Sequence, residues 1–84
     1  MTNTPLPRSS LEPVCPALAV VIRQRREARG WSLNRLAKLT CLSRHMIAFI
    51  ESNERVPTID TVARIARAFG VRCSRLVAEA ERRL

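Results

Sequence analysis

Residues that start and stop helices divide this chain into short segments. Ser32, Ser43 and Thr58 each stand where a side-chain oxygen can accept an N–H of the first turn of a helix. Gly30 and Gly70 stand where a residue of left-handed conformation ends a helix. This pattern predicts five short helices and no strand, which is an all-α fold.

Within the segments, apolar residues recur three or four positions apart, as on one face of a helix. The predicted helices cover residues 16–29, 33–39, 43–51, 59–69 and 75–84. Ser74 is expected to cap the last of them. The apolar residues assigned to these helices or to the core are Leu18, Val21, Ile22, Leu33, Leu36, Ala37, Leu39, Leu42, Ile47, Ile50, Ile59, Val62, Ile65, Ala66, Phe69, Val71 and Leu76.

The first 13 residues differ in composition from the rest of the chain. They hold three of the five prolines, with serine, threonine and asparagine, which is typical of a flexible arm. Residues 14–84 are expected to form one compact five-helix domain with a modest core, because the chain has only 84 residues. Apolar residues make up 46% of the chain, which argues against the disordered class.

The charge indicates an anionic partner. The chain has 15 Lys+Arg residues against 7 Asp+Glu, a formal net charge of +8, and only Lys38 among the basic residues is not arginine. Domains this basic typically bind polyanions, and arginine forms bidentate contacts with phosphates and guanine edges. One histidine, no paired carboxylates and no glycine-rich phosphate loop indicate that the chain is not an enzyme.

The cysteines and the apolar runs indicate a cytoplasmic protein. Cys15, Cys41 and Cys73 have no CxxC spacing, which fits reduced thiols better than disulfides. Cys41 and His45 are spaced as zinc ligands, but no second pair completes a site, so neither a metal nor a cofactor is expected. The apolar run 17–22 is too short to span a bilayer, and the N-terminus does not read as a signal peptide.

Residues 33–52 have the pattern of a helix-turn-helix motif. A short turn at Cys41 and Leu42 joins two short helices, and Ala37 is small enough for them to cross closely. In this motif the second helix enters the major groove of DNA. When Ile47 and Ile50 of that helix point inward, its opposite face remains free to read bases.

The sequence from about Leu18 to Glu79 resembles the lambda-repressor-like (Cro/repressor, or xenobiotic-response-element-type) helix-turn-helix family. The resemblance rests on the spacing of Arg26, Gly30, Ser32, Ala37, Ser43, Ile47, Ile50, Glu51, Pro57 and Gly70. It implies a DNA-binding domain in which Arg26 and Glu51 form a structural ion pair.

The residues expected to contact DNA form two groups. Arg44, His45, Ala48 and Phe49 match the base-reading positions of the family, and their chemistry suits guanine, adenine and thymine-methyl edges. Asn34, Arg35, Ser43, Arg55 and Thr58 are expected to contact phosphates, in part through helix N-termini. Two alternatives stay open here: Phe49 packs against a neighbouring helix or Trp31, or His45 faces solvent or a phosphate.

Four positions depart from the family pattern. Leu33 replaces a glutamine that holds a phosphate, and Cys41 replaces a glycine in the turn. Glu54 stands where a basic residue is frequent, and Arg25 replaces a leucine of the first helix, which predicts a thinner core at that end.

The resemblance implies a transcription regulator, a repressor or an activator, that binds a two-fold operator as a homodimer. Val77, Ala80 and Leu84 of the last helix are expected to face the second copy, unless they pack within the same chain. One alternative is an antitoxin that binds a toxin partner and its own promoter. Another is a helix-turn-helix used only for assembly, against which the charge and Arg44 argue.

Overall fold

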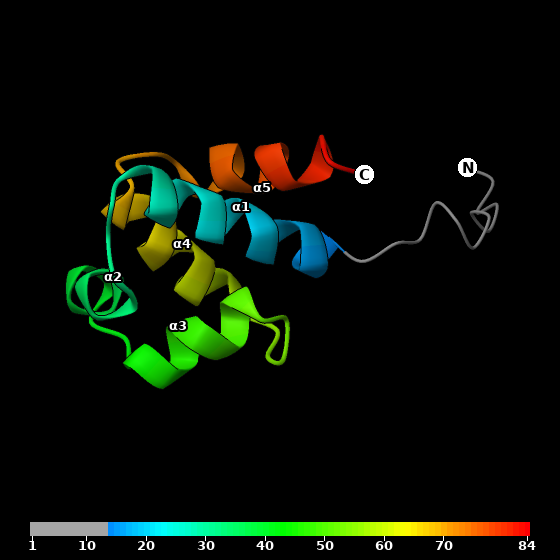
Figure 1. Ribbon diagram of the computed structural model, residues 1–84. Coiled ribbons are helices and arrows are strands. Elements are labelled where there is room, and N and C mark those ends of the chain that lie inside the picture. Colours follow the sequence, from blue (N-terminus) through cyan, green and yellow to red (C-terminus); the bar gives the residue numbers. More distant parts are fainter. Residues whose placement is uncertain (1–13) are drawn as a thin grey trace, which may run out of the picture.

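The computed structural model describes residues 14–84 and shows five α-helices in that part of the chain (Figure 1). The helices are α1 (Val14–Ala28), α2 (Leu33–Thr40), α3 (Arg44–Glu51), α4 (Ile59–Ala68) and α5 (Cys73–Glu81). Residues 14–84 contain no strand, so the predicted all-α class is confirmed. The arm predicted for residues 1–13 lies outside the described residues.

Three helices begin where the sequence predicts. Ser32, Ser43 and Thr58 have extended backbones, and each side-chain oxygen accepts the backbone N–H three residues further on. Each bond satisfies one N–H that the first turn would otherwise leave unpaired. The starts of α2, α3 and α4 are therefore set by local chemistry.

The start of α5 differs from the prediction. Gly70 has a φ of 74°, and the N–H of Val71 bonds to the carbonyl of Ala66. This tight turn lets α5 begin at Cys73, with Arg72 as an N-cap that makes no side-chain bond. The prediction that Ser74 caps this helix is wrong, because Ser74 already lies within its first turn.

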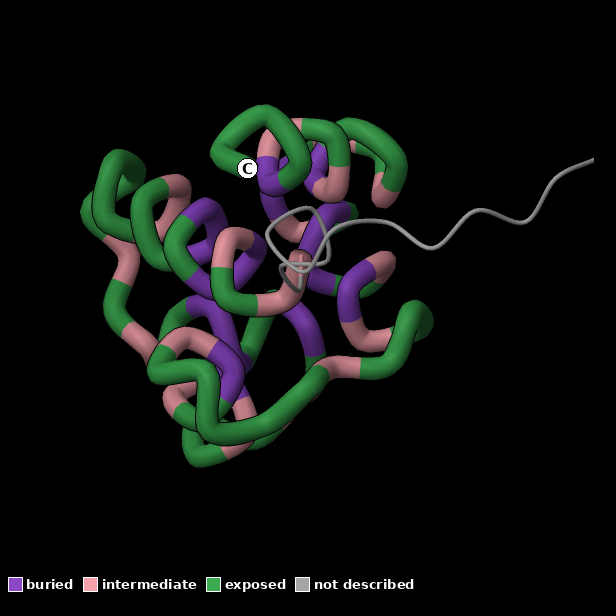
Figure 2. Tube along the Cα trace, turned by 90° about the vertical axis from the view of Figure 1, so that its right-hand side faces the viewer, coloured by how far each residue is buried: buried purple, intermediate pink, exposed green. Residues whose placement is uncertain are grey.

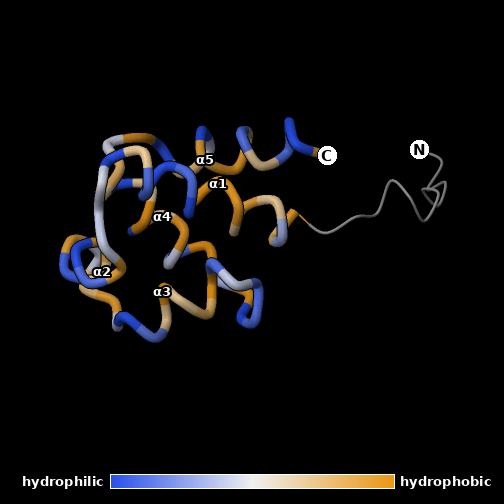
Figure 3. The backbone as a smooth tube through the Cα atoms, in the orientation of Figure 1, coloured by the Kyte–Doolittle hydropathy of each residue, from blue (hydrophilic) through white to orange (hydrophobic). Residues whose placement is uncertain are grey.

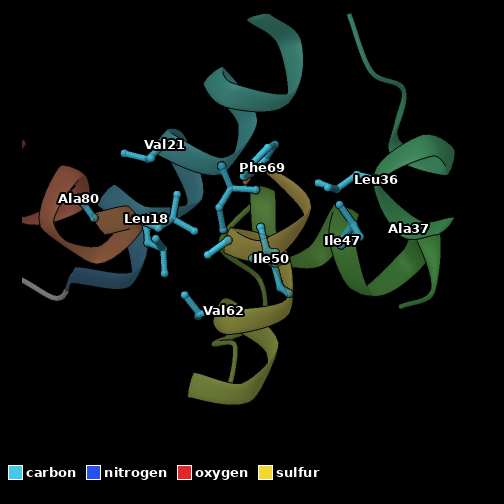
Figure 4. Close-up of a cluster of buried hydrophobic side chains, with 13 residues drawn as sticks. Leu18, Val21, Leu36, Ala37, Ile47, Ile50, Val62, Phe69 and Ala80 are labelled. Atoms are coloured by element: carbon cyan, nitrogen blue, oxygen red, sulfur yellow. The ribbon is translucent and has the colours of Figure 1, made fainter. Parts of the chain in front are cut away.

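The core receives at least one fully buried aliphatic side chain from every helix. Ile22, Leu36, Ile47, Ile65 and Leu76 come from α1 to α5 in turn, and each is 0% exposed. Figure 2 shows the buried positions on the inner sides of the helices, and Figure 4 shows the side chains that meet between them. The other members of the cluster are Leu18, Val21, Ala37, Ile50, Val62, Ala66, Phe69 and Ala80.

Some apolar residues do not lie where the sequence predicts. Ile59 is 67% exposed, because it is the first residue of α4 and extends beyond the core, and Leu39 is 42% exposed. Ala80 is 0% exposed, so its predicted availability to a second copy is wrong. The reason is that Leu76 and Ala80 are four residues apart and share the buried face of α5.

The helices place α3 and α5 on opposite sides of the molecule. The most extensive packing is between α1 and α5, while α2 packs on α3 and α4. Figure 1 shows α3 at the lower edge and α5 at the upper edge, with α1 and α4 between them. Hydrophilic residues gather at the start of α3 and in the loop after it (Figure 3). Within the described residues, every helix is too short or too polar to cross a membrane.

The burial of α4 gives a direct test of this core. Ile65→Ala should lower the free energy of unfolding by about 2–5 kcal/mol, because it removes a fully buried side chain and leaves a cavity. Ile59→Ala removes the same atoms from an exposed site and should cost less than about 1 kcal/mol. Urea unfolding followed by circular dichroism measures both values, and equal losses would contradict the packing of α4.

Candidate nucleic-acid interface

The turn between α2 and α3 is closed by backbone hydrogen bonds. Cys41 has a φ of 59°, and the N–H of Leu42 bonds to the carbonyl of Ala37 at 3.1 Å. A left-handed residue at this point satisfies carbonyls at the end of α2 and reverses the chain. Leu42 then packs against the core, so the turn holds α3 at a defined angle to α2.

The outer face of α3 carries the residues predicted to read bases. Arg44 and His45 are exposed, Ala48 is half-buried, and Phe49 is 43% exposed. The rings of His45 and Phe49 lie one helical turn apart, with centroids separated by 6.4 Å. The opposite face holds Ile47, which is completely buried. The structure thus brings a cation, an imidazole and an aromatic ring together on one accessible surface.

Trp31 is not available to Phe49. Its ring stacks on Phe69, the C-cap residue of α4, with centroids 5.7 Å apart and an interplanar angle of 8°. The Arg29 guanidinium lies 5.4 Å from the Trp31 ring and 5.0 Å from the Phe69 ring, and it also donates to the Phe69 carbonyl. This stack ties the segment before α2 to the end of α4. The alternative in which Phe49 packs against Trp31 is wrong.

Arg26 holds the end of α3 against α1. Its Nε and Nη2 donate to the two Glu51 carboxylate oxygens at 2.8 and 2.9 Å, and its Nη1 donates to the Trp31 carbonyl at 2.8 Å. The side chains of Arg26 and Glu51 are only 12% and 5% exposed. The bond to Glu51 raises the pKa of Arg26. The two residues predicted as an ion pair therefore meet in a bidentate, largely desolvated contact.

The predicted phosphate ligands are all exposed. Asn34 and Arg35 are exposed in the first turn of α2, and Arg55 is exposed in the loop after α3. The hydroxyl oxygens of Ser43 and Thr58 serve as helix caps, so each has a structural role whether or not it contacts DNA.

The loop after α3 is held in place by its own backbone. Asn53 has a φ of 61°, a left-handed conformation that asparagine adopts more readily than most residues, and the N–H groups of Glu54 and Arg55 both donate to the Phe49 carbonyl. The Glu54 carboxylate accepts the Ser52 hydroxyl at 2.8 Å. These bonds fix where the exposed side chain of Arg55 leaves the loop.

A second bidentate pair was missed by the sequence reasoning. Both Arg25 Nε, at 2.9 Å, and Arg25 Nη2 donate to the Glu79 carboxylate, joining α1 to α5. This bond raises the pKa of Arg25 and lowers that of Glu79. Arg25 therefore ties the two helices together at the position where a thinner core was predicted. The two residues are 54 positions apart, so no local spacing indicates their contact.

A comparison with protein-family models identifies the family of this chain. The model described as Helix-turn-helix (HTH_3) matches residues 22–76, which is more than half of the chain. The chain belongs to the helix-turn-helix family. The HTH-type transcriptional regulator SutR of Escherichia coli (strain K12) is 41% identical over 61 residues, which are 73% of this chain and 34% of SutR. The chain thus spans about a third of the length of this curated relative.

Solved structures share the fold. A crystal structure of an HTH_3 family transcriptional regulator from Vibrio cholerae has a TM-score of 0.71 and 34% identity, covering 77% of this chain and 36% of that one. The clp gene regulator ClgR from Corynebacterium glutamicum has a TM-score of 0.77 and 21% identity, covering 84% of this chain and 76% of its own. At that identity, ClgR shows the shared fold alone.

Breaking the ion pair of α3 should be costly. Glu51→Gln leaves the Arg26 charge desolvated and unpaired, so it should lower the free energy of unfolding by about 3–5 kcal/mol. Glu27→Gln is the matched control. Glu27 lies 3.8 Å from Arg23 in a pair whose side chains are about 60% exposed, so it should change stability by less than about 0.5 kcal/mol. Urea unfolding separates the two outcomes, and a small loss in Glu51→Gln would contradict a structural role for the pair.

The Arg25–Glu79 pair should make stability depend on pH. Because folding lowers the pKa of Glu79, its contribution is present above the ordinary glutamate pKa and disappears as the pH falls through the lowered value. Stability should therefore fall as the pH drops below about 4.5, the ordinary glutamate pKa, and Glu79→Gln should make this fall smaller. Thermal melts at pH values above and below the ordinary glutamate pKa test this prediction, with Glu81→Gln as the control on the same helix. An unchanged pH profile in Glu79→Gln would refute it.

Proposed function

We propose that this chain recognises a specific double-stranded DNA sequence with α3 and regulates transcription from the site it binds. The observation that supports this best is the row formed by exposed Arg44, His45 and Phe49 with half-buried Ala48, on a helix whose other face is anchored in the core. A major groove admits an α-helix, and residues near the N-terminus of that helix reach the base edges first.

The reading row offers three kinds of contact. Arg44 can donate two hydrogen bonds to the O6 and N7 atoms of guanine, which is the commonest specific contact in the major groove. His45 can donate to guanine, or accept from adenine when neutral. Ala48 and Phe49 present apolar surface that fits thymine methyl groups. This mixture discriminates among base pairs, which a uniformly basic face would not do.

Phosphate contacts supply most of the affinity and set the register. Asn34, Arg35, Ser43, Arg55 and Thr58 are the proposed ligands, distributed on both sides of the reading row along the chain. The N-termini of α2 and α3 add backbone N–H groups and a favourable dipole for an anion. Such contacts carry no sequence information of their own.

A second copy completes the proposed regulator. One α3 reads only a few base pairs. A homodimer on two-fold-related half-sites reads a DNA site long enough to be distinguished from the many competing sites in a genome. Val77 is half-buried on α5, and Leu84 at the C-terminus is 58% exposed. These two residues stay as the proposed contact between copies, and Ala80 is no longer part of it.

Fluorescence anisotropy with the full chain tests the function. Labelled DNA from its own promoter and an unrelated duplex of the same length are compared at two salt concentrations. Promoter binding should be at least about 10³-fold tighter than control binding, and both should weaken steeply as salt rises. Arg44→Ala should lose about 10-fold or more of the preference, while Arg55→Ala should weaken both duplexes alike.

One binding result would contradict the proposed function. Equal, weak binding to both duplexes that is unaffected by Arg44→Ala would contradict base reading by α3. That result would favour the alternative in which the chain acts through a protein partner, as an antitoxin does.

A further inference from the structure

The segment between α1 and α2 is held by side chains rather than by packing of the two helices that it joins. Within residues 14–84, α2 packs on α3 and α4, and α1 packs on α5 and α3, but α1 and α2 share no comparable contact. The chain turns at Gly30, whose φ is 68°, and enters α2 at the Ser32 cap. Trp31 lies between the turn and the cap, so the contacts that fix Trp31 also fix the start of α2.

Arg29 connects Trp31 to the end of α4. Its guanidinium lies 5.4 Å from the Trp31 ring and 5.0 Å from the Phe69 ring, within the range at which aromatic faces attract a cation. It also donates to the Phe69 carbonyl at 3.0 Å and to the Arg25 carbonyl at 3.4 Å. Both carbonyls lie at C-terminal ends of helices, where the helix dipole favours a positive charge. Arg29 therefore joins the end of α1, the end of α4 and the residue before the cap of α2.

The aromatic partner of Trp31 is a fixed point of the fold. Phe69 is 4% exposed and belongs to the core cluster, so the ring stacked on it is held against the core. Figure 1 shows the segment between α1 and α2 running past the end of α4. The first turn of α2 follows directly and exposes Asn34 and Arg35, two of the proposed phosphate ligands. Because binding groups must be placed to within about 0.5 Å, a loosened Trp31 would weaken their contacts.

We propose that Arg29 is a positioning residue for DNA binding, an inference that rests on the function proposed above. By holding Trp31 on Phe69, Arg29 sets the place of the first turn of α2 on the DNA backbone. It acts through the phosphate ligands of α2, because both of its Nη groups already donate to backbone carbonyls.

A double-variant cycle tests the proposal. Fluorescence anisotropy gives the affinities of the wild type, Arg29→Ala, Arg35→Ala and the chain with both changes. Two duplexes are used, one that the wild type selects from a random-sequence library and one unrelated duplex. Arg29→Ala should weaken binding to both by about fivefold at 0.1 M salt, the scale of one lost phosphate contact. The loss in the double variant should be clearly smaller than the product of the two single losses, because both changes act on the same contact.

Trp31→Leu separates positioning from a direct effect of charge. It removes the stacked ring and leaves the net charge unchanged, so it should weaken binding to both duplexes by a factor similar to that of Arg29→Ala. Urea unfolding verifies that each variant is folded under the binding conditions. A purely structural role would lower stability and leave the affinity of the folded protein unchanged.

Arg82→Ala is the matched control for the lost charge. Arg82 is exposed just after α5, on the far side of the molecule from α3. Its removal should change the affinity by less than about twofold, because salt screens a distant exposed charge.

Three results would overturn the proposal. If folded Arg29→Ala binds both duplexes like the wild type, Arg29 only stabilises the fold. If its loss multiplies with that of Arg35→Ala, or if Trp31→Leu has no effect, Arg29 does not act through α2. Failure of the proposed function looks different, because the wild type itself would then select no duplex. The affinities for the unrelated duplex would still decide the role of Arg29.

Discussion

The position of α3 depends on the Arg26 guanidinium. Its hydrogen bonds reach Glu51 at the end of α3 and the Trp31 carbonyl just before α2, so one side chain of α1 fixes three segments. Both charges of the pair are largely desolvated, and such a contact is stable only when its geometry and its hydrogen bonds are complete. The inner face of α3 packs in the core and its end is held by Arg26. Its outer face is therefore accessible, as the proposed contact with DNA requires.

Most of the fold could be predicted because its signals are local. Ser32, Ser43 and Thr58 act on the turn that follows them, and apolar periodicity identifies the inner faces of the helices. The start of α5 could not be predicted this way, since the Gly70 turn sets it without a side-chain cap. Ala80 was assigned to the surface because a small apolar residue fits either side of a helix, and only the packing of α5 on α1 decides.

Some parts of the candidate site could likewise be predicted from local sequence signals, and others could not. The outward direction of Arg44 and Phe49 follows from the inward direction of Ile47, because the helical period fixes one face once the other is known. The Arg25–Glu79 pair is formed by residues from separate helices. Their neighbours are set by helix packing, which a single sequence does not encode in any spacing.

The most direct measurement of the central claim is selection of duplexes from a random-sequence library by the folded full chain, followed by sequencing. An α3 that reads bases predicts enrichment of one motif, with half-sites related by two-fold symmetry and about one turn of DNA apart. Arg44→Ala should relax that motif at one position in each half-site. Recovery of a pool with no enriched motif, from a protein that binds DNA and is folded, would contradict sequence reading by α3.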